Sequence, residues 1–363
     1  MDSQADTQPD LPQTPAKRHK CAACYRQYKK REHLMEHMKM SYHSVHQPKC
    51  GVCQKHCKSF ESLREHLIGP LPKGNCSEHF SQYGCPLCLK LFDSPTALIE
   101  HKEICYLSAP TPLGTEPLTN IRSPKHCSDY SDENHTGRPP GAIAIDCEMV
   151  GGGSDGTIDL CARVCMVDED ENLIFHTYVQ PQIPVTNYRY DITGLTEEHL
   201  RDAMPLKEVQ EKVLEILYNG ESIGKVRLDG GKAKLLVGHD LEHDLDCLNL
   251  TYPGHMLRDT AKYRPLMKTN LVSHSLKYLT RTYLGYDIQT DTHDPFEDCV
   301  SVMRLYKRIR GQVHTEENFR AFTPSSVTSN SDSWNSKELE NCTPDELFAM
   351  SKSDYKCWCS DSM

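Results

Sequence analysis

Three pairs of cysteines with Cys-x2-Cys spacing recur in the first third of the chain and limit what this part can fold into. The pairs begin at Cys21, Cys50 and Cys85, so successive units start 29 and 35 residues apart. A segment this short buries too little apolar surface to fold alone and usually needs disulfides or a metal. The polar start, MDSQADTQPD, is unlike a secretory signal, so we expect an intracellular protein in which metal ligation is favoured over disulfides.

The spacing in the first unit, C-x2-C-x12-H-x5-H, resembles the C2H2 zinc finger, with Tyr28 and Leu34 as its small apolar core. We expect a hairpin to supply the two cysteines and one face of a helix to supply the two histidines, giving a ββα unit. In the second unit the fourth ligand is open between Cys76, which we favour, and His79. Free buried cysteines are the alternative for all three units. The predicted zinc ligands are Cys21, Cys24, His37 and His43; Cys50, Cys53, His66 and Cys76; and Cys85, Cys88, His101 and Cys105.

Charge is distributed unevenly along the chain. Residues 16–50 carry nine Lys/Arg and two Glu, whereas the whole chain has a net charge of −10. A basic segment on an acidic protein favours a polyanionic partner, and Arg26, Lys29, Lys30 and Arg31 suit phosphate contacts. The second and third units are close to neutral and could contact protein or pack together. The run Lys17–Lys20 is either a short nuclear-import signal or a solvated basic stretch. Together with a nucleic-acid partner, it favours a nuclear or nucleolar location, with the cytoplasm as the alternative.

Composition divides the chain into five parts. Residues 1–15 are expected to be disordered, 16–105 to form three zinc fingers, and 106–140, rich in Pro, Ser, Thr and Asp, to form a flexible linker. Residues 141–312 alternate apolar strand patterns with amphipathic helix patterns, which predicts an α/β domain. Residues 313–363 are expected to be a mostly disordered tail. No run reaches the roughly 20 apolar residues that a membrane span requires.

The run AIAIDCEMV predicts a buried strand that ends in two acids. Alternate residues of a strand share a face, so Asp146 and Glu148 project together and Cys147 points away, where we expect it to pack in the core. Two adjacent buried carboxylates repel each other, and a divalent cation would remove that conflict. Taken alone, the motif is more often two solvated acids at an exposed strand end.

A second acidic motif, THDPFEDCV, predicts the start of a helix. Asp294 is the expected N-cap, Pro295 the first helical residue, and Glu297 the third residue of a capping box. Asp298 is then fixed in the first turn, while His293 lies on the preceding loop.

The motifs DCEMVG, GHDLEHDL and H-x4-D resemble those of the DEDDh exonucleases. The fuller set, with LCARVCMVD, VTNYRYDITGL, RDT and SLKYL over about residues 141–310, resembles the interferon-stimulated exonuclease, apoptosis-enhancing nuclease and Rex-type RNA exonuclease branch. The resemblance implies an RNase H-like fold and hydrolysis of nucleic acid from its 3′ end with two divalent metals. It assigns the metal-binding acids and the general base by position: Asp146, Glu148, Asp244 and Asp298, with His293 as base.

The resemblance also bears on substrate and cofactor. Met149 is similar to a residue that packs on the terminal nucleotide and Arg189 to one that contacts substrate, with a core methionine and an exposed arginine as the alternatives. Oxygen ligands favour Mg²⁺ or Mn²⁺ in the active site, and Zn²⁺ is expected in the fingers. RNA is expected more than DNA. The rival hypothesis is a zinc-finger binding factor with an inactive nuclease-like domain, but such a domain would be expected to lack at least one of the five motif residues, and all are present.

Overall fold

The computed structural model describes residues 18–41, 43–44, 46–113, 140–222, 224, 226, 228, 231–312, 343–350 and 355–362. The expectations for residues 1–15, for most of the 106–140 linker and for 313–342 lie outside the described residues. The chain forms two compact units: the first comprises Met1–Gln47, Gln54–His56 and Glu316–Asp354, and the second the remainder. Each is described by itself.

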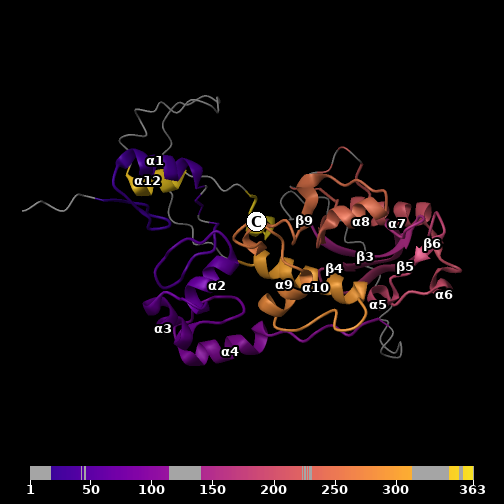
Figure 1. The fold of residues 1–363 in the computed structure, drawn as a ribbon, viewed down its shortest axis with the longest axis horizontal. Helices are drawn as coiled ribbons and strands as arrows, with labels where there is room; N and C mark the ends of the chain where they lie inside the picture. The colour runs from indigo at the N-terminus through magenta and orange to yellow at the C-terminus, as the bar shows by residue number, and fades with distance from the viewer. Residues whose placement is uncertain are drawn as a thin grey trace, which may run out of the picture. The chain divides into compact units, whose positions relative to one another are not determined.

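The first unit contains the first predicted finger. Strands β1 (His19–Lys20) and β2 (Gln27–Tyr28) form an antiparallel pair, and helix α1 (Arg31–Met40) follows. Its buried face packs against the C-terminal helix α12 (Pro344–Met350), which lies beside α1 in Figure 1. This core consists of Cys21, Ala23, Leu34, Met35, Met38 and Leu347.

The second unit is built on a mixed sheet with strand order β7-β5-β4-β3-β8-β9, to which β6 adds beside β3. The pairs β3–β4, β4–β5 and β3–β6 are antiparallel, whereas β3–β8, β8–β9 and β5–β7 are parallel. This mixed sheet confirms the predicted α/β class. The strands are β3 (Ala142–Gly152), β4 (Ile158–Asp168), β5 (Leu173–Gln180), β6 (Val185–Asn187), β7 (Met204–Pro205), β8 (Leu235–Gly238) and β9 (Leu257–Asp259).

Helices cover the sheet, with α7 and α8 on one side of the strands and α9 and α10 on the other (Figure 1). Helix α10 is the longest and contacts β3, β4 and β8. Helix α7 ends where its sequence indicates, at Asn219 in the left-handed conformation. The helices are α5 (Tyr190–Thr193), α6 (Glu197–Leu200), α7 (Leu206–Tyr218), α8 (Leu241–Cys247), α9 (Leu276–Tyr283) and α10 (Pro295–Arg310), with short 3-10 turns η1 (Gly254–Met256) and η2 (Arg264–Leu266).

The second and third fingers differ from the expected ββα form. The third has a single bridge, Gly84 to Leu91, in place of a hairpin, followed by α4 (Pro95–Cys105). The second has two helices, α2 (Phe60–Ile68) and α3 (Gly74–Tyr83). Among the described residues, only the first finger therefore has the predicted pair of strands before its helix.

Fingers two and three pack directly on the sheet domain. The Arg64 guanidinium donates to the carbonyl of Thr282 at 3.1 Å, and Arg308 donates to the carbonyl of Cys105 at 2.6 Å. The ring of Phe60 meets the ring of Tyr283 edge-on, with centroids 6.0 Å apart. The apolar residues of the second finger belong to the same core cluster as the sheet, whereas most of those of the third form a small cluster of their own. Both fingers fall in the same compact unit as the α/β domain.

A C-terminal segment also belongs to this unit. Turn η3 (Trp358–Ser362) carries Asp361, whose carboxylate accepts two 2.6 Å hydrogen bonds from buried Arg258. Trp358 stacks on Tyr263 with ring centroids 3.9 Å apart.

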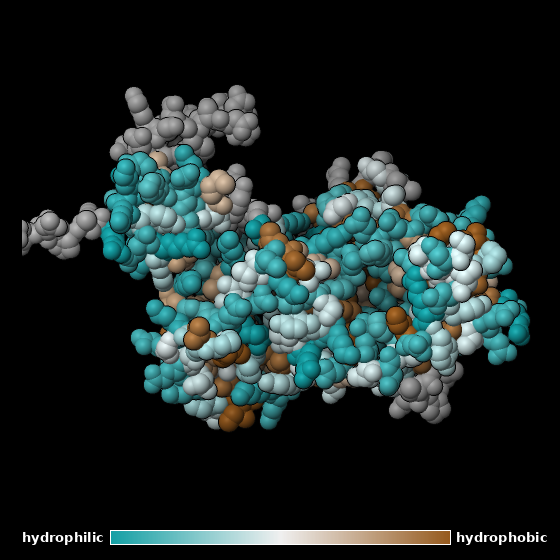
Figure 2. Space-filling view, viewed as in Figure 1, coloured by the Kyte–Doolittle hydropathy of each residue, from teal (hydrophilic) through white to brown (hydrophobic). Residues whose placement is uncertain are grey.

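The face of the molecule seen in Figure 2 is mainly hydrophilic, and apolar residues occur on it in small separate groups. Among the described residues, no helix has both the length and the apolar character needed to cross a bilayer.

Candidate active site

The predicted acids come from three elements: three of them line one cleft, and Asp244 is buried beside them against β3. Strand β3 supplies Asp146 and Glu148, α8 supplies Asp244, and the first turn of α10 supplies Asp298. Glu148, Asp244 and Asp298 are each no more than 5% exposed. The cleft is lined by Asp146, Cys147, Glu148, Met149, Arg189, Ile192, Thr193, His239, Leu276, Gln289, His293 and Asp298.

Asp244 is held against β3 by a backbone contact. Its Oδ1 accepts a 2.9 Å hydrogen bond from the N–H of Cys147, the residue between the two strand acids. Asp240 is the N-cap of helix α8. It adopts a left-handed backbone conformation, and its carboxylate pairs with exposed His243 and Lys262. Asp246 is exposed on the same helix. Of the three aspartates in this region, Asp240, Asp244 and Asp246, only Asp244 is buried.

The N-terminus of α10 fixes Asp298. Asp294 caps the helix, because its Oδ1 accepts from the N–H groups of Phe296 and Glu297 at 3.0 and 3.2 Å. The predicted capping box is absent: the Glu297 carboxylate accepts instead from the N–H of Gln289 at 3.1 Å. That capping-box prediction was wrong because the preceding loop folds back over the helix end and offers Glu297 a closer donor.

Two residues that the sequence did not single out connect these elements. Arg163 on β4 lies opposite Glu148 in the strand register, and its Nη2 donates to Asp294 Oδ2 at 3.2 Å. The side-chain amide of Gln289 donates to Asp298 Oδ2 at 2.8 Å. Both contacts join residues that are distant in sequence or on different elements, so no local spacing signals them.

His293 lies on the loop before α10 and lines the cleft. Its backbone N–H donates to the carbonyl of Ile192 at 2.6 Å, which ties this loop to α5. Partial burial, with a smaller contribution from the charge of Lys277, lowers the pKa of the His293 imidazole below its usual value. The imidazole is therefore neutral near physiological pH and can accept a proton.

The acids strongly disfavour being charged together. Burial and then the charge of Asp298 raise the pKa of Asp146 well above its ordinary value, and burial does the same for Asp244. Burial and the charge of Asp298 raise the pKa of Glu148 to about 8, although Arg163 opposes this. Burial raises the pKa of Asp298 to about 7. Without a cation, the site therefore retains protons at neutral pH.

The donor set fits a hard divalent cation. Oδ1 of Asp298 is buried and has no hydrogen-bond partner in the described part of the chain. An unpaired buried carboxylate oxygen is costly, and a metal ion would satisfy it. Four carboxylates are a set of hard oxygen donors, which favours Mg²⁺ or Mn²⁺ over Zn²⁺.

The other end of the cleft is partly apolar. Met149 and Leu276 both line it, together with Ile192. Arg189 also lines it, in a left-handed backbone conformation, and its guanidinium pairs with Asp159 at 2.6 Å. Leu276, Ile192, Thr193 and His239 were not among the predicted site residues, because the elements that carry them meet only in the folded domain.

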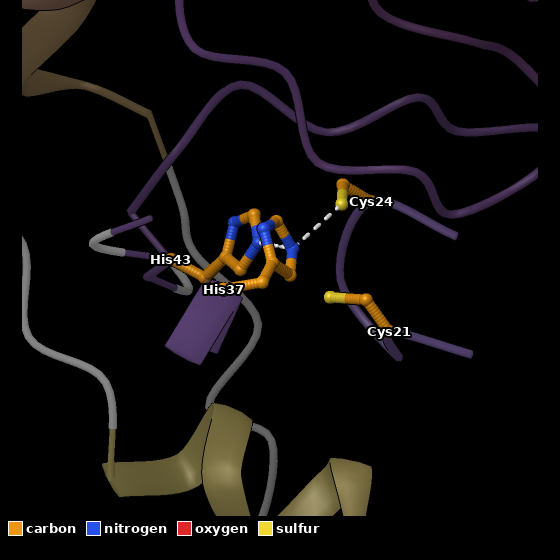
Figure 3. Close-up of side chains that lie close together, drawn as sticks. All are labelled: Cys21, Cys24, His37 and His43. Atoms are coloured by element: carbon orange, nitrogen blue, oxygen red, sulfur yellow. Dashed lines mark hydrogen bonds between the residues drawn. The ribbon is translucent and has the colours of Figure 1, made fainter. Parts of the chain in front are cut away.

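Each predicted finger brings four ligand side chains together, with all ligand atoms of a set within 4.8 Å of one another. In the first, Cys24 Sγ lies 3.2 Å from His37 Nε2, and His43 Nε2 lies 3.2 Å from the same atom (Figure 3). The prediction that both histidines lie on one helix face was wrong, since α1 ends at Met40 and His43 follows it. In the second finger, the fourth member is Cys76 on α3.

Comparison with known proteins gives the following similarities. The profile of the RNase T family, described as "Exonuclease", matches residues 143–306. RNA exonuclease 4 of Gibberella zeae is 38% identical over 167 residues, covering 46% of this chain and 48% of that protein. The human RNA exonuclease 4 is 36% identical, and the match covers 47% of this chain and 37% of that protein. The Candida glabrata RNA exonuclease 4 is 33% identical over 196 residues, and the match covers 53% of this chain and 68% of that protein.

The similarity thus spans about half the length, or less, of the first two of these relatives. Among solved structures, the Neurospora crassa Pan2 catalytic unit (protease and nuclease domain) aligns with a TM-score of 0.39 and 23% identity, covering 50% of this chain and 28% of that one.

Proposed function

Because the chain belongs to the RNase T family of exonucleases and is related to RNA exonuclease 4, we propose that it is a metal-dependent 3′–5′ exonuclease acting on RNA. The observation that carries the proposal is a cleft lined by three carboxylates, Asp146, Glu148 and Asp298, and by His293. A fourth carboxylate, that of Asp244, is buried behind it against the backbone of Cys147. Carboxylates that share a buried site and an unpaired oxygen on Asp298 support cation binding. The names of the relatives support RNA as the substrate.

When bound, two divalent cations would lower the pKa of the attacking water and stabilise the departing 3′ oxygen. Asp146, Glu148, Asp244 and Asp298 would hold them. His293 would accept the proton of the attacking water, because its imidazole is neutral at physiological pH and its loop is anchored at Ile192.

The apolar part of the cleft suits the end of a nucleic-acid strand. Met149 and Leu276 offer apolar surface against which a terminal base can stack, and such stacking is tolerant of sequence. Arg189 offers a cation for a backbone phosphate near the same cleft. This arrangement suits removal of one terminal nucleotide at a time without base-specific recognition.

The Cys/His clusters would bind Zn²⁺ as structural ions. Each set has four ligands and the sulfur and imidazole donors that tetrahedral zinc prefers. The second and third zinc sites would hold their fingers in the shape that packs on the exonuclease domain. The first finger, with Arg26 and Arg31 near its helix start, is the one suited to phosphate contacts.

The experiment compares short 5′-labelled RNA and DNA strands of the same sequence, each with a free or a phosphorylated 3′ end, in Mg²⁺. We expect a ladder that shortens from the 3′ end, faster cleavage of RNA than of DNA, and slower cleavage of blocked ends. Internal cleavage that ignores the 3′ block would contradict the exonuclease assignment. Equal cleavage of both strands would contradict the preference for RNA.

A further inference from the structure

Three thiol groups lie directly beside the catalytic carboxylates and take no part in the proposed reaction. Cys147, Cys161 and Cys247 come from β3, β4 and α8, and their Sγ atoms all lie within 4.8 Å of one another. All three are free thiols; Cys147 and Cys161 are buried and Cys247 is half-buried. Strand alternation predicts that Cys147 points away from the two acids and packs in the core. Its two partners in the cluster lie on other elements of the fold, so no local spacing indicates them.

This cluster shares backbone with the acids. Cys147 separates Asp146 from Glu148, and its N–H donates to Asp244 Oδ1. On the other side, the Cys247 thiol donates to the backbone carbonyl of Asp244 at 3.2 Å. A change in the positions of these sulfurs therefore acts on three of the four proposed metal-binding acids.

The strand register favours a shared cation over a disulfide. Cys147 lies opposite Val164, whereas Cys161 lies opposite Met149, so the two cysteines occupy diagonal positions on neighbouring strands. Diagonal side chains have Cβ atoms about 7 Å apart, and a disulfide requires about 4 Å. Three thiolates bound to one thiophilic cation at about 2.3 Å would lie roughly 3.8 Å apart. Sulfurs that already lie within 4.8 Å of one another need only a small contraction to reach that arrangement.

We propose that Cys147, Cys161 and Cys247 form a binding site for a thiophilic divalent cation such as Zn²⁺, and that its occupancy inhibits the exonuclease. On binding, the three S–H bonds break, their protons pass to solvent, and three metal–sulfur bonds form. Half-buried Cys247 provides the route of entry.

Inhibition follows from the contraction of the cluster. Drawing the sulfurs together pulls β3 toward α8 at the point where Cys147 and Asp244 are hydrogen-bonded. A displacement of about 1 Å in catalytic groups lowers a rate by about 100-fold. The inhibitory half of the proposal rests on the proposed function, whereas the binding half does not.

The test uses the full chain with zinc-loaded fingers, kept reduced with a phosphine. Cys161→Ala and Cys247→Ser remove two sulfurs without altering an acid. Cys299→Ala is the matched control, because Cys299 is a buried thiol on α10 outside the cluster whose Sγ donates to the carbonyl of Cys165. Bound zinc per chain is measured by elemental analysis after equilibration with buffered free Zn²⁺, and cleavage in Mg²⁺ is titrated with the same zinc buffer.

We expect wild type and Cys299→Ala to bind one more zinc than the Cys161→Ala/Cys247→Ser variant. We also expect that variant to need about 10- to 100-fold more free Zn²⁺, or still more, for half-inhibition. Loss of a residue that only hydrogen-bonds to a metal ligand already weakens metal binding by that factor. Equal zinc content would overturn the site, and equal zinc sensitivity would overturn the inhibition. If wild type cleaves nothing, the proposed function fails, while the zinc count still decides the site.

Discussion

Arg163 donates to Asp294 across 3.2 Å, and this single ion pair joins the strand opposite Glu148 to the cap of the helix that carries Asp298. Both side chains are almost completely buried, and the Arg163 Nε also contacts His176 Nε2 at 2.9 Å. The pair therefore fixes the spacing between two of the proposed metal-binding acids, Glu148 and Asp298, which come from opposite ends of the domain sequence.

Replacing Arg163 with methionine should separate positioning from folding. We expect Arg163→Met to lower kcat by about 10- to 100-fold with a smaller change in KM, because outer partners orient metal ligands. The Mg²⁺ concentration that half-saturates the activity should rise in Arg163→Met. Arg163→Lys should recover part of the lost kcat and part of the Mg²⁺ affinity. Exposed Arg281 gives the matched control, Arg281→Met. A loss of thermal stability in Arg163→Met with unchanged Mg²⁺ dependence would mean that Arg163 is only structural.

The raised pKa values of the acids predict how stability depends on pH without Mg²⁺. Glu148 titrates at about 8 and Asp298 at about 7 in the folded chain, against ordinary values of 4.5 and 3.8. The folded state therefore binds protons more tightly than the unfolded state, so its stability falls as pH rises from about 4 to about 8. Mg²⁺ should raise the Tm more at pH 8 than at pH 5, since it binds the deprotonated acids.

A neutral substitution checks that interpretation. Asp146→Asn removes a carboxyl that ionises freely in the unfolded chain but whose ionisation the folded site opposes. We therefore expect it to raise the Tm of the Mg²⁺-free protein at pH 8 and to abolish cleavage. Scanning calorimetry on zinc-loaded protein at several pH values measures both effects. A lower Tm for Asp146→Asn at pH 8 would show that repulsion among the acids is not the dominant destabilising effect.

His293 should carry the proton transfer. We expect His293→Ala to lower kcat by about 10²- to 10⁴-fold while leaving the Kd for RNA nearly unchanged, as is usual for loss of a general base. Because burial lowers the pKa of His293, wild type should keep its base unprotonated at and above about pH 6.5. His243→Ala, at an exposed position of α8, is the control and should retain activity. A His293→Ala variant with normal kcat would assign the base to another group.

Zinc removal should affect the two units differently. Cys50→Ser/Cys53→Ser should release α2 and lower the stability of the exonuclease domain by about 2–3 kcal/mol, the value of burying one large apolar side chain such as Phe60. Cys21→Ser/Cys24→Ser disrupts a cluster in the other compact unit and should leave the unfolding transition of the exonuclease domain unchanged. Calorimetric unfolding of the two double variants measures this, and equal destabilisation would contradict the division into units.

Local spacing was enough to predict the parts of the site that lie within one element. Asp146 and Glu148 share a strand face because side chains alternate, and Asp294 and Pro295 start α10 at the residue that the cap signal indicates. The choice of Asp244 over its neighbours came from a family resemblance. The structure shows the physical difference: Asp244 is 4% exposed and Asp246 is exposed.

Contacts between distant elements could not be predicted from spacing. The Arg163–Asp294 pair spans 131 residues, and the bond from Arg64 to Thr282 spans 218. The packing of the second and third fingers on α9 and α10 depends on the surface that the folded sheet domain presents. The cluster of Cys147, Cys161 and Cys247 likewise exists only once β4 and α8 are placed beside β3.

The most direct test of the central claim compares two acids two residues apart on α8. Asp244 is buried beside β3, whereas Asp246 is exposed. The measurement is the initial rate of 3′-end shortening of 5′-labelled RNA in Mg²⁺ by wild type, Asp244→Asn and Asp246→Asn at equal folded concentration. We expect Asp244→Asn to lose nearly all activity and Asp246→Asn to match wild type. Equal rates for all three proteins would contradict a metal site built on Asp244.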